Sequence, residues 1–168
     1  MKFISPGALT FCLLFTMLLL GRYGNTSARI TEALQPAKTL LIFEKKPCFG
    51  FCPVYKAEFL STGEVKVKYT RPYRPAQTET FRLSKDEVCE LWTRGEKLGV
   101  FKMKNRYETL ITDFQVRELT LFDKGGLPKN IYYTEGASPE FELYLRDLAD
   151  LVERNLKVSF EPEKEENK

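Results

Sequence analysis

The sequence predicts a single α+β domain in two layers, in which a mainly antiparallel sheet is covered by two amphipathic helices. Three observations support this fold class. The chain has 168 residues, enough for one domain behind an N-terminal targeting segment. Its strand-like segments are joined by short turns, which favours antiparallel pairing. Two further segments carry apolar residues at helical spacing, and such helices need a sheet face to cover. The predicted order of elements is ββββαββα.

Residues 1–28 are predicted to be a signal peptide. Lys2 gives a short positive start, and the apolar run from Ala8 to Leu20 is too short to span a bilayer comfortably. Thr26-Ser27-Ala28 then provides the small residues of a cleavage site. An uncleaved anchor is the alternative. The pattern predicts a secreted or periplasmic protein with no stable membrane insertion after cleavage.

The remaining chain is predicted to contain one folded domain between two irregular ends. Residues 29–38 are polar, contain Pro36 and form a lead-in. Residues 39–158 are predicted to be the α+β domain. Residues 159–168 are charged and without apolar periodicity, which predicts a disordered tail.

The first strands are predicted from apolar patterning. The short apolar run from Thr39 to Glu44 suits a central strand covered on both faces. Alternation from Tyr55 to Tyr69 predicts a hairpin, closed by the loop Ser61-Thr62-Gly63 with Gly63 in the left-handed conformation. This register places three pairs on one face: Tyr55 with Tyr69, Ala57 with Val67, and Phe59 with Val65.

A fourth strand is predicted from Gln77 to Leu83, followed by the first helix. Ser84 with Glu87 three residues later makes a capping box, and Gly99 ends the helix. Cys89 lies beside the apolar stripe of this helix and is expected to be buried as a small hydrophobe. The stripe consists of Val88, Leu91, Trp92 and Leu98.

The second half of the chain is predicted to add a hairpin and a final helix. The link from Lys102 to Asp113 is polar and irregular. Val116 to Phe122 and Asn130 to Thr134 are predicted strands around a turn at Asp123 to Gly126. Ser138-Pro139 provides the cap and first turn of the last helix. Its stripe consists of Phe141, Tyr144, Leu145, Leu148, Leu151, Val152 and Leu156.

Composition argues against several classes of function. The chain contains no histidine, which excludes Ser-His-Asp and Cys-His catalysis and histidine-ligated zinc. Cleavage after Ala28 would remove Lys2 and Arg22 and lower the net charge from +3 to +1, which does not favour nucleic-acid binding. No cofactor or metal is predicted. These features favour a non-catalytic protein.

One stretch is chemically unusual: Cys48-Phe49-Gly50-Phe51-Cys52-Pro53, with Tyr55 two residues further on. It resembles the hallmark of a family of exported bacterial proteins that is classed only as a domain of unknown function. Further resemblances are found at Val100 to Tyr107, at Thr112-Asp113, at Gly126 to Tyr133 and in the helix after Pro139, so that residues 39 to 156 are covered. The resemblance implies the fold and brings no activity. Many such proteins are lipoproteins, but Cys12 follows Phe11 where lipidation needs a small residue.

Four interpretations of the cysteines stay open. A Cys48–Cys52 disulfide would be a structural clasp, made possible by a turn at Gly50. Alternatively, one of these cysteines pairs with Cys89, because spacing alone does not fix the connectivity. The third interpretation is thiol-disulfide exchange, although a strand rather than a helix follows the motif. The fourth is a zinc site of three thiolates.

Two other groups of residues are candidate sites. Arg106, Tyr107, Thr112 and Asp113 form a possible polar site, in which Asp113 and Glu108 are the pair able to share acid–base work. Basic and aromatic residues between positions 66 and 85 form a possible polyanion site, or simply the solvated side of a hairpin. We therefore expect an exported binding or structural module whose partner is a protein or a glycan. The alternative is a thiol-disulfide protein that uses Cys48 and Cys52.

Overall fold

The computed structural model describes residues 36–50, 52–70, 75–108 and 114–156. The chain divides into two units, Met1–Pro36 and Ala37–Lys168, and the fold reported below belongs to the second. The predicted signal peptide and the predicted tail at 159–168 lie outside the described residues. No described helix has the length and apolar character that crossing a bilayer requires.

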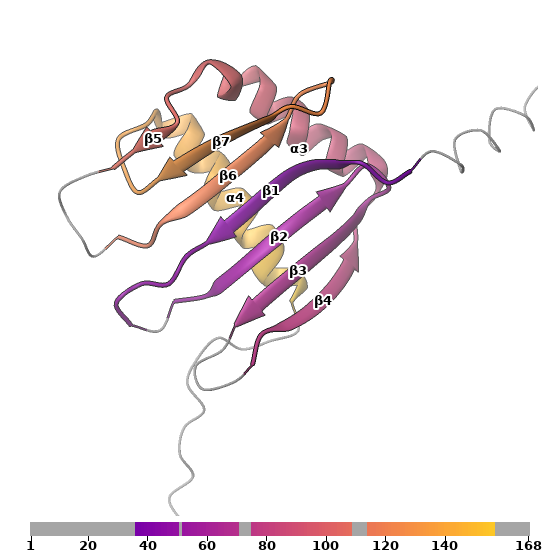
Figure 1. The fold of residues 1–168 in the computed structure, drawn as a ribbon, viewed down its shortest axis with the longest axis horizontal. Helices are drawn as coiled ribbons and strands as arrows, with labels where there is room; N and C mark the ends of the chain where they lie inside the picture. Colours follow the sequence, from indigo (N-terminus) through magenta and orange to yellow (C-terminus); the bar gives the residue numbers. More distant parts are fainter. Residues whose placement is uncertain (1–35, 51, 71–74, 109–113, 157–168) are drawn as a thin grey trace, which may run out of the picture. The chain divides into compact units, whose positions relative to one another are not determined.

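The described part of the chain forms one seven-stranded sheet (Figure 1). Its spatial order is β4-β3-β2-β1-β6-β7-β5, so that β1 lies at the centre. Neighbouring strands are antiparallel, except that the short β5 runs parallel to β7. The strands are β1 (Thr39–Lys45), β2 (Val54–Leu60), β3 (Glu64–Thr70), β4 (Gln77–Arg82), β5 (Arg106–Tyr107), β6 (Arg117–Phe122) and β7 (Pro128–Tyr133).

Two helices, α3 (Lys85–Lys97) and α4 (Pro139–Asn155), lie on the same face of this sheet and cross behind its strands (Figure 1). A 3₁₀ turn, η1 (Val100–Lys102), follows α3. The opposite face of the sheet is left without a helix among the described residues. The predicted two-layer α+β fold is therefore confirmed, with β5 and the 3₁₀ turn as additions.

The β2–β3 hairpin has the predicted register. Tyr55 pairs with Tyr69, Ala57 with Val67, and Phe59 with Val65. Gly63 adopts a φ of 86°, and its N–H donates to the carbonyl of Leu60 at 2.9 Å. Because a positive φ is costly for residues with a Cβ atom, glycine at this position fixes the turn and with it the register of both strands.

Both helices begin at the predicted caps. The Ser84 hydroxyl accepts from the N–H of Glu87, and the Glu87 carboxylate accepts from the N–H of Ser84. The Ser138 hydroxyl accepts from the N–H of Phe141 at 3.3 Å. After α3, Gly99 takes a φ of 76°. These local signals fix where each helix starts and where the first one ends.

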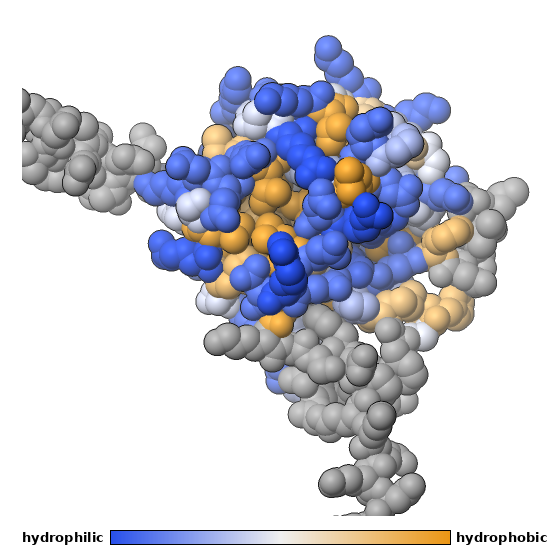
Figure 2. All heavy atoms as spheres, turned by 180° about the vertical axis from the view of Figure 1, so that it is seen from behind, coloured by the Kyte–Doolittle hydropathy of each residue, from blue (hydrophilic) through white to orange (hydrophobic). Residues whose placement is uncertain are grey.

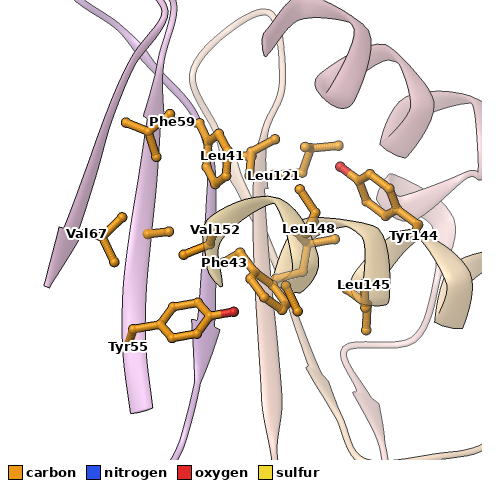
Figure 3. Close-up of a cluster of buried hydrophobic side chains, with 14 of the residues drawn as sticks. Leu41, Phe43, Tyr55, Phe59, Val67, Leu121, Tyr144, Leu145, Leu148 and Val152 are labelled. Atoms are coloured by element: carbon orange, nitrogen blue, oxygen red, sulfur yellow. The ribbon is translucent and has the colours of Figure 1, made fainter. Parts of the chain in front are cut away.

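The core lies between the helices and one face of the sheet (Figure 3). Leu41 and Phe43 of β1 are fully buried, as are Ala57 and Phe59 of β2 and Val65 and Val67 of β3. The indole N–H of Trp92 donates to the carbonyl of Phe122 at 2.7 Å, which ties α3 to the end of β6. The largest side chains of this core are Tyr55, Tyr133, Tyr144, Phe43, Phe59 and Phe141.

Three predictions about this fold were wrong in detail. Cys89 is exposed rather than buried, because α3 directs Val88 toward the sheet and the next residue is turned about 100° away from it. In β1 only Leu41 and Phe43 are fully buried, because both helices pack on one side of the strand. The link from Lys102 to Asp113 is not wholly irregular, since Arg106–Tyr107 pairs with β7.

Candidate functional site

The cysteine motif forms the loop between β1 and β2, which we call the cysteine loop and define as residues 46–53. It lies at the end of the sheet where β1 ends and where β2 and β6 begin (Figure 1). The N–H of Lys46 donates to the carbonyl of Val116 at 2.9 Å, which continues the pairing of β1 and β6 into the loop. The loop therefore starts from the central strand of the fold.

Cys48 and Cys52 are joined as a disulfide, which is the first of the four interpretations given above. Their Cα atoms lie 6.0 Å apart, within the usual range for this bond. Gly50 between them has a φ of 127°, and a Cβ atom at this position would meet nothing within 4 Å. Glycine is needed here for its backbone conformation rather than for space.

Gln115 closes the neck of the cysteine loop from the neighbouring segment. Its side-chain N–H₂ group donates to the carbonyl of Lys46 at 2.8 Å and to the carbonyl of Pro53 at 2.7 Å. These two carbonyls stand at the two ends of the loop. The partly buried Gln115 amide thus links the two ends of the loop, and the Cys48–Cys52 disulfide links the chain a second time inside them.

We expect Gln115→Leu to lower the free energy of unfolding by about 1–3 kcal/mol, since it leaves two partly buried carbonyls without their donor. Hydrogen exchange at the N–H of Lys46 should accelerate with it. Asn130→Leu is the matched control, because the Asn130 amide donates to Thr120 on the exposed surface. Equal urea midpoints for the two variants would show that the bridge does not brace the loop.

Tyr55, the last residue of the motif, connects β2 to α4. Its ring packs into the core beside Phe43, with the centroids 6.1 Å apart (Figure 3). Its hydroxyl donates to the Glu153 carboxylate at 3.1 Å, and the Lys45 ammonium donates to the same oxygen at 2.8 Å. Burial, and then the nearby Glu153 carboxylate, raise the pKa of Tyr55. A raised pKa opposes a role for this phenol as a base or a nucleophile.

We expect the raised pKa of Tyr55 to make the fold sensitive to alkali. Unfolded tyrosine ionises at about pH 10, so the contribution of this group is complete below that pH and is lost as the pH rises toward the folded pKa. Denaturant unfolding at about pH 9 and about pH 11 should show a loss of stability that is smaller in Tyr55→Phe. Part of the loss should persist, because burial also raises the pKa of Tyr144. Identical losses in both proteins would contradict this assignment.

Lys45 at the end of β1 and Lys46 at the start of the cysteine loop are both paired with carboxylates. Lys45 contacts Glu153 at 2.8 Å. Lys46 contacts Glu44 at 2.7 Å and Glu118 at 3.6 Å, and the hydrogen bond with Glu44 raises its pKa. The positive charge beside the loop is therefore largely neutralised within the protein, which does not favour an anion site here.

Phe49 stands apart from the other described motif residues. Its side chain is 85% exposed, whereas Cys48, Cys52 and Pro53 are half-buried and Tyr55 is buried. Phe114 is also exposed, at 45%, and it directly precedes Gln115 at the neck of the loop. The end of the sheet that carries the cysteine loop therefore exposes two aromatic side chains, Phe49 and Phe114, to solvent.

The possible polar site is only partly described. Arg106 is exposed, pairs with Glu108 at 2.7 Å and lies over the ring of Tyr132 at 4.2 Å. Tyr107 turns to the other side of the sheet, where its ring lies 6.4 Å from that of Tyr133. Arg106 and Tyr107 are therefore not brought together. Thr112 and Asp113 lie outside the described residues.

The remaining cysteine among the described residues lies 37 positions along the chain from the disulfide. Cys89 is an exposed free cysteine on α3, beside Asp86, Glu90 and Lys97. Within the described ranges, no group of three cysteine, aspartate or glutamate side chains is placed to hold a metal ion. The described thiols thus form one disulfide and one surface cysteine.

Sequence reasoning missed two features of this site. Gln115 carries no motif, and its bonds reach 69 and 62 positions along the chain. The pairing of Lys45 with Glu153 joins residues 108 positions apart. The only signal in the sequence was the isolated polar residue between Phe114 and Val116, which does not reveal its partners.

Fold and loop together define a class of protein: a small α+β domain with an antiparallel sheet, two helices on one face and a disulfide-closed loop after the central strand. The chain belongs to the family described as a domain of unknown function (DUF6438), whose model matches residues 39–154. The match spans every strand of the sheet and nearly all of α4. No match to a curated protein was found.

Proposed function

We propose that this protein is an exported, non-catalytic binding module that contacts a protein or a glycan through Phe49 in the cysteine loop. The observation that carries the proposal is the division of roles within the motif. Cys48 and Cys52 close the loop, Pro53 accepts a hydrogen bond from Gln115, and Tyr55 fills the core. Phe49 alone among the described motif residues directs a large side chain into solvent.

An exposed aromatic side chain such as Phe49, on a loop closed by a disulfide, suits binding on energetic grounds. Aromatic side chains are enriched in the centres of interfaces, where they supply a large apolar area with few rotatable bonds. Ordering a flexible loop would reduce the net affinity, and the disulfide and the Gln115 bridge constrain this loop at Cys48, at Cys52 and at its two ends. The N-terminal signal pattern and the absence of histidine support an exported protein with a role other than imidazole catalysis.

The proposal predicts that a photo-reactive phenylalanine analogue at position 49 captures a discrete partner. The full chain carrying this analogue would be produced in its native host and irradiated, and the products separated by mass. Position 127 is the matched control, because Leu127 is 70% exposed in the β6–β7 turn. A product that depends on position 49 is expected, and its sensitivity to protease separates a protein from a glycan. Equal labelling from both positions, or none from position 49, would contradict the proposal.

A further inference from the structure

The outer edge of β4 is a second feature that the cysteine loop does not explain. β4 is the end strand of the sheet, and no described strand lies beyond it (Figure 1). It pairs with β3 over six consecutive positions without a bulge and contains no proline. The strand at the opposite end, β5, has only two residues. Natural sheets usually shorten, bend or cover their edges; β5 is short in this way, whereas the described residues neither shorten nor cover β4.

The direction of the backbone groups along β4 follows from one hydrogen bond. The N–H of Leu83 donates to the carbonyl of Gly63 at 2.9 Å, so this residue directs its backbone toward β3. In an antiparallel pair, alternate residues bond to the neighbour and those between direct their N–H and C=O groups away. Thr78, Thr80 and Arg82 therefore direct their backbone groups toward the outer edge. An added strand would find a regular row of donors and acceptors there.

An apolar groove lies just beyond the end of β4, where Leu83 meets residues of α3 and α4. It has a volume of about 160 Å³. Its apolar walls are Leu83, Leu91 and Leu151, all half-buried, and Glu87, Glu90 and Arg94 form its polar rim. The helix-covered face shows exposed hydrophobic atoms among the charged ones (Figure 2). A side chain that projects toward the helices from the part of an added strand beside Leu83 would lie next to this groove.

The open side of the same edge is basic. Arg82 lies on β4 itself, and Lys66 and Lys68 lie on β3 opposite Thr80 and Thr78. All three side chains are exposed, and the described structure gives Lys66 only a long pairing, at 3.8 Å, with Glu64. An added strand with acidic side chains on this side would complement their charge.

We propose that β4 accepts an extended peptide segment of a protein partner as an eighth strand, with apolar side chains toward the groove and acidic side chains toward Lys66, Lys68 and Arg82. Backbone pairing would provide affinity and the alternating side chains selectivity, as in other cases of strand addition. A second copy of this chain is a poorer occupant, because antiparallel pairing of two β4 strands would place both sets of basic residues on one face. This surface is separate from Phe49, so either proposal can fail without the other.

The test uses the full chain and a peptide of about eight residues that alternates valine with glutamate. Binding is expected to slow hydrogen exchange at the N–H groups of Thr78, Thr80 and Arg82. A peptide with lysine in place of glutamate should bind about tenfold or more weakly, and backbone N-methylation should abolish binding. No slowing at these three amides, equal binding of the N-methylated peptide, or self-association through this edge would each overturn the proposal.

Two variants separate strand addition from a general effect on folding. Thr80→Pro removes an outward N–H that β3 does not use, so it should reduce peptide affinity about tenfold or more while the urea midpoint changes little. Arg82→Glu should shift the preference from the glutamate peptide toward the lysine peptide. Thr120→Ala on the inner strand β6 is the control and should change neither property. Unchanged affinity and unchanged charge preference in the two β4 variants would contradict the proposal.

Discussion

Gly63→Val is expected to lower the free energy of unfolding by roughly 3 kcal/mol, the largest effect of any single change proposed for this protein. Two costs combine at this position. The backbone has a φ of 86°, which a β-branched residue strongly disfavours. A Cβ atom would also collide with the carbonyl of Leu83. That carbonyl cannot easily move, because the N–H of Leu83 is bonded to Gly63 and Ser84 beside it caps α3.

Gly99→Val separates these two costs. Gly99 has a φ of 76°, close to that of Gly63, but a Cβ atom there would meet nothing within 4 Å. The Gly99→Val variant should therefore lose only about 1–2 kcal/mol of unfolding free energy, because only the backbone conformation is disfavoured. Denaturant unfolding of both variants measures the difference. If Gly99→Val destabilised the protein as much as Gly63→Val, the contact with Leu83 would not be what makes Gly63 necessary.

Replacing Cys48 and Cys52 together by serine is expected to cost about 2 kcal/mol or more. Closing a loop this short contributes about 2 kcal/mol in the chain-entropy model, and native disulfides of secreted domains commonly contribute 2–5 kcal/mol. The loss should appear in urea midpoints measured without reductant. The sheet should persist, because the core of this domain does not include either cysteine.

Cys89→Ser is the matched control for that variant. Cys89 is exposed on α3, and surface substitutions usually change stability by less than about 0.5 kcal/mol. Peptide mapping under non-reducing conditions should recover the Cys48–Cys52 pair with Cys89 free and accessible to alkylation. A mapped bond from Cys89 to either loop cysteine, or a large loss of stability in Cys89→Ser, would contradict the observed connectivity.

Most features of this fold that could be predicted follow from sequence patterns a few residues long. The β2–β3 register follows from alternation and from the one residue, Gly63, able to close the turn. The helix starts follow from Ser84 and Ser138, whose hydroxyls each satisfy a backbone N–H three residues later. Each of these signals is complete within a few residues, so that it can be read without knowing which segments lie side by side.

Features that depend on distant contacts were not predictable. Cys89 was expected to be buried beside the apolar stripe because Gly95 was not recognised as part of that stripe. Gly95 is buried against Leu121 and Tyr144, where a Cβ atom would lie 3.1 Å from each. The face of α3 that meets the sheet is therefore centred away from Cys89. The strand at Arg106–Tyr107 is defined by its pairing with β7. Two residues are too few to show a strand pattern in the sequence.

The cysteine motif combines both kinds of feature. Gly50 made a tight turn closed by a Cys48–Cys52 disulfide possible, as one of four interpretations that the spacing of the cysteines left open. The role of Tyr55 as a link to Glu153, and that of Gln115 as a brace, depend on segments far away in sequence. These contacts give the motif a structural role in the loop, and among its described residues Phe49 has the large side chain that is exposed.

The measurement that tests this assignment most directly is the reduction of the Cys48–Cys52 bond in the folded protein against glutathione buffers. A structural clasp held at its neck by Gln115 is expected to resist the glutathione pool, with a potential below about −300 mV. Cys89→Ser provides a background free of other thiols among the described residues. Reduction near about −200 mV, where dedicated thiol-exchange proteins operate, would contradict the structural role and favour thiol-disulfide chemistry at Cys48 and Cys52.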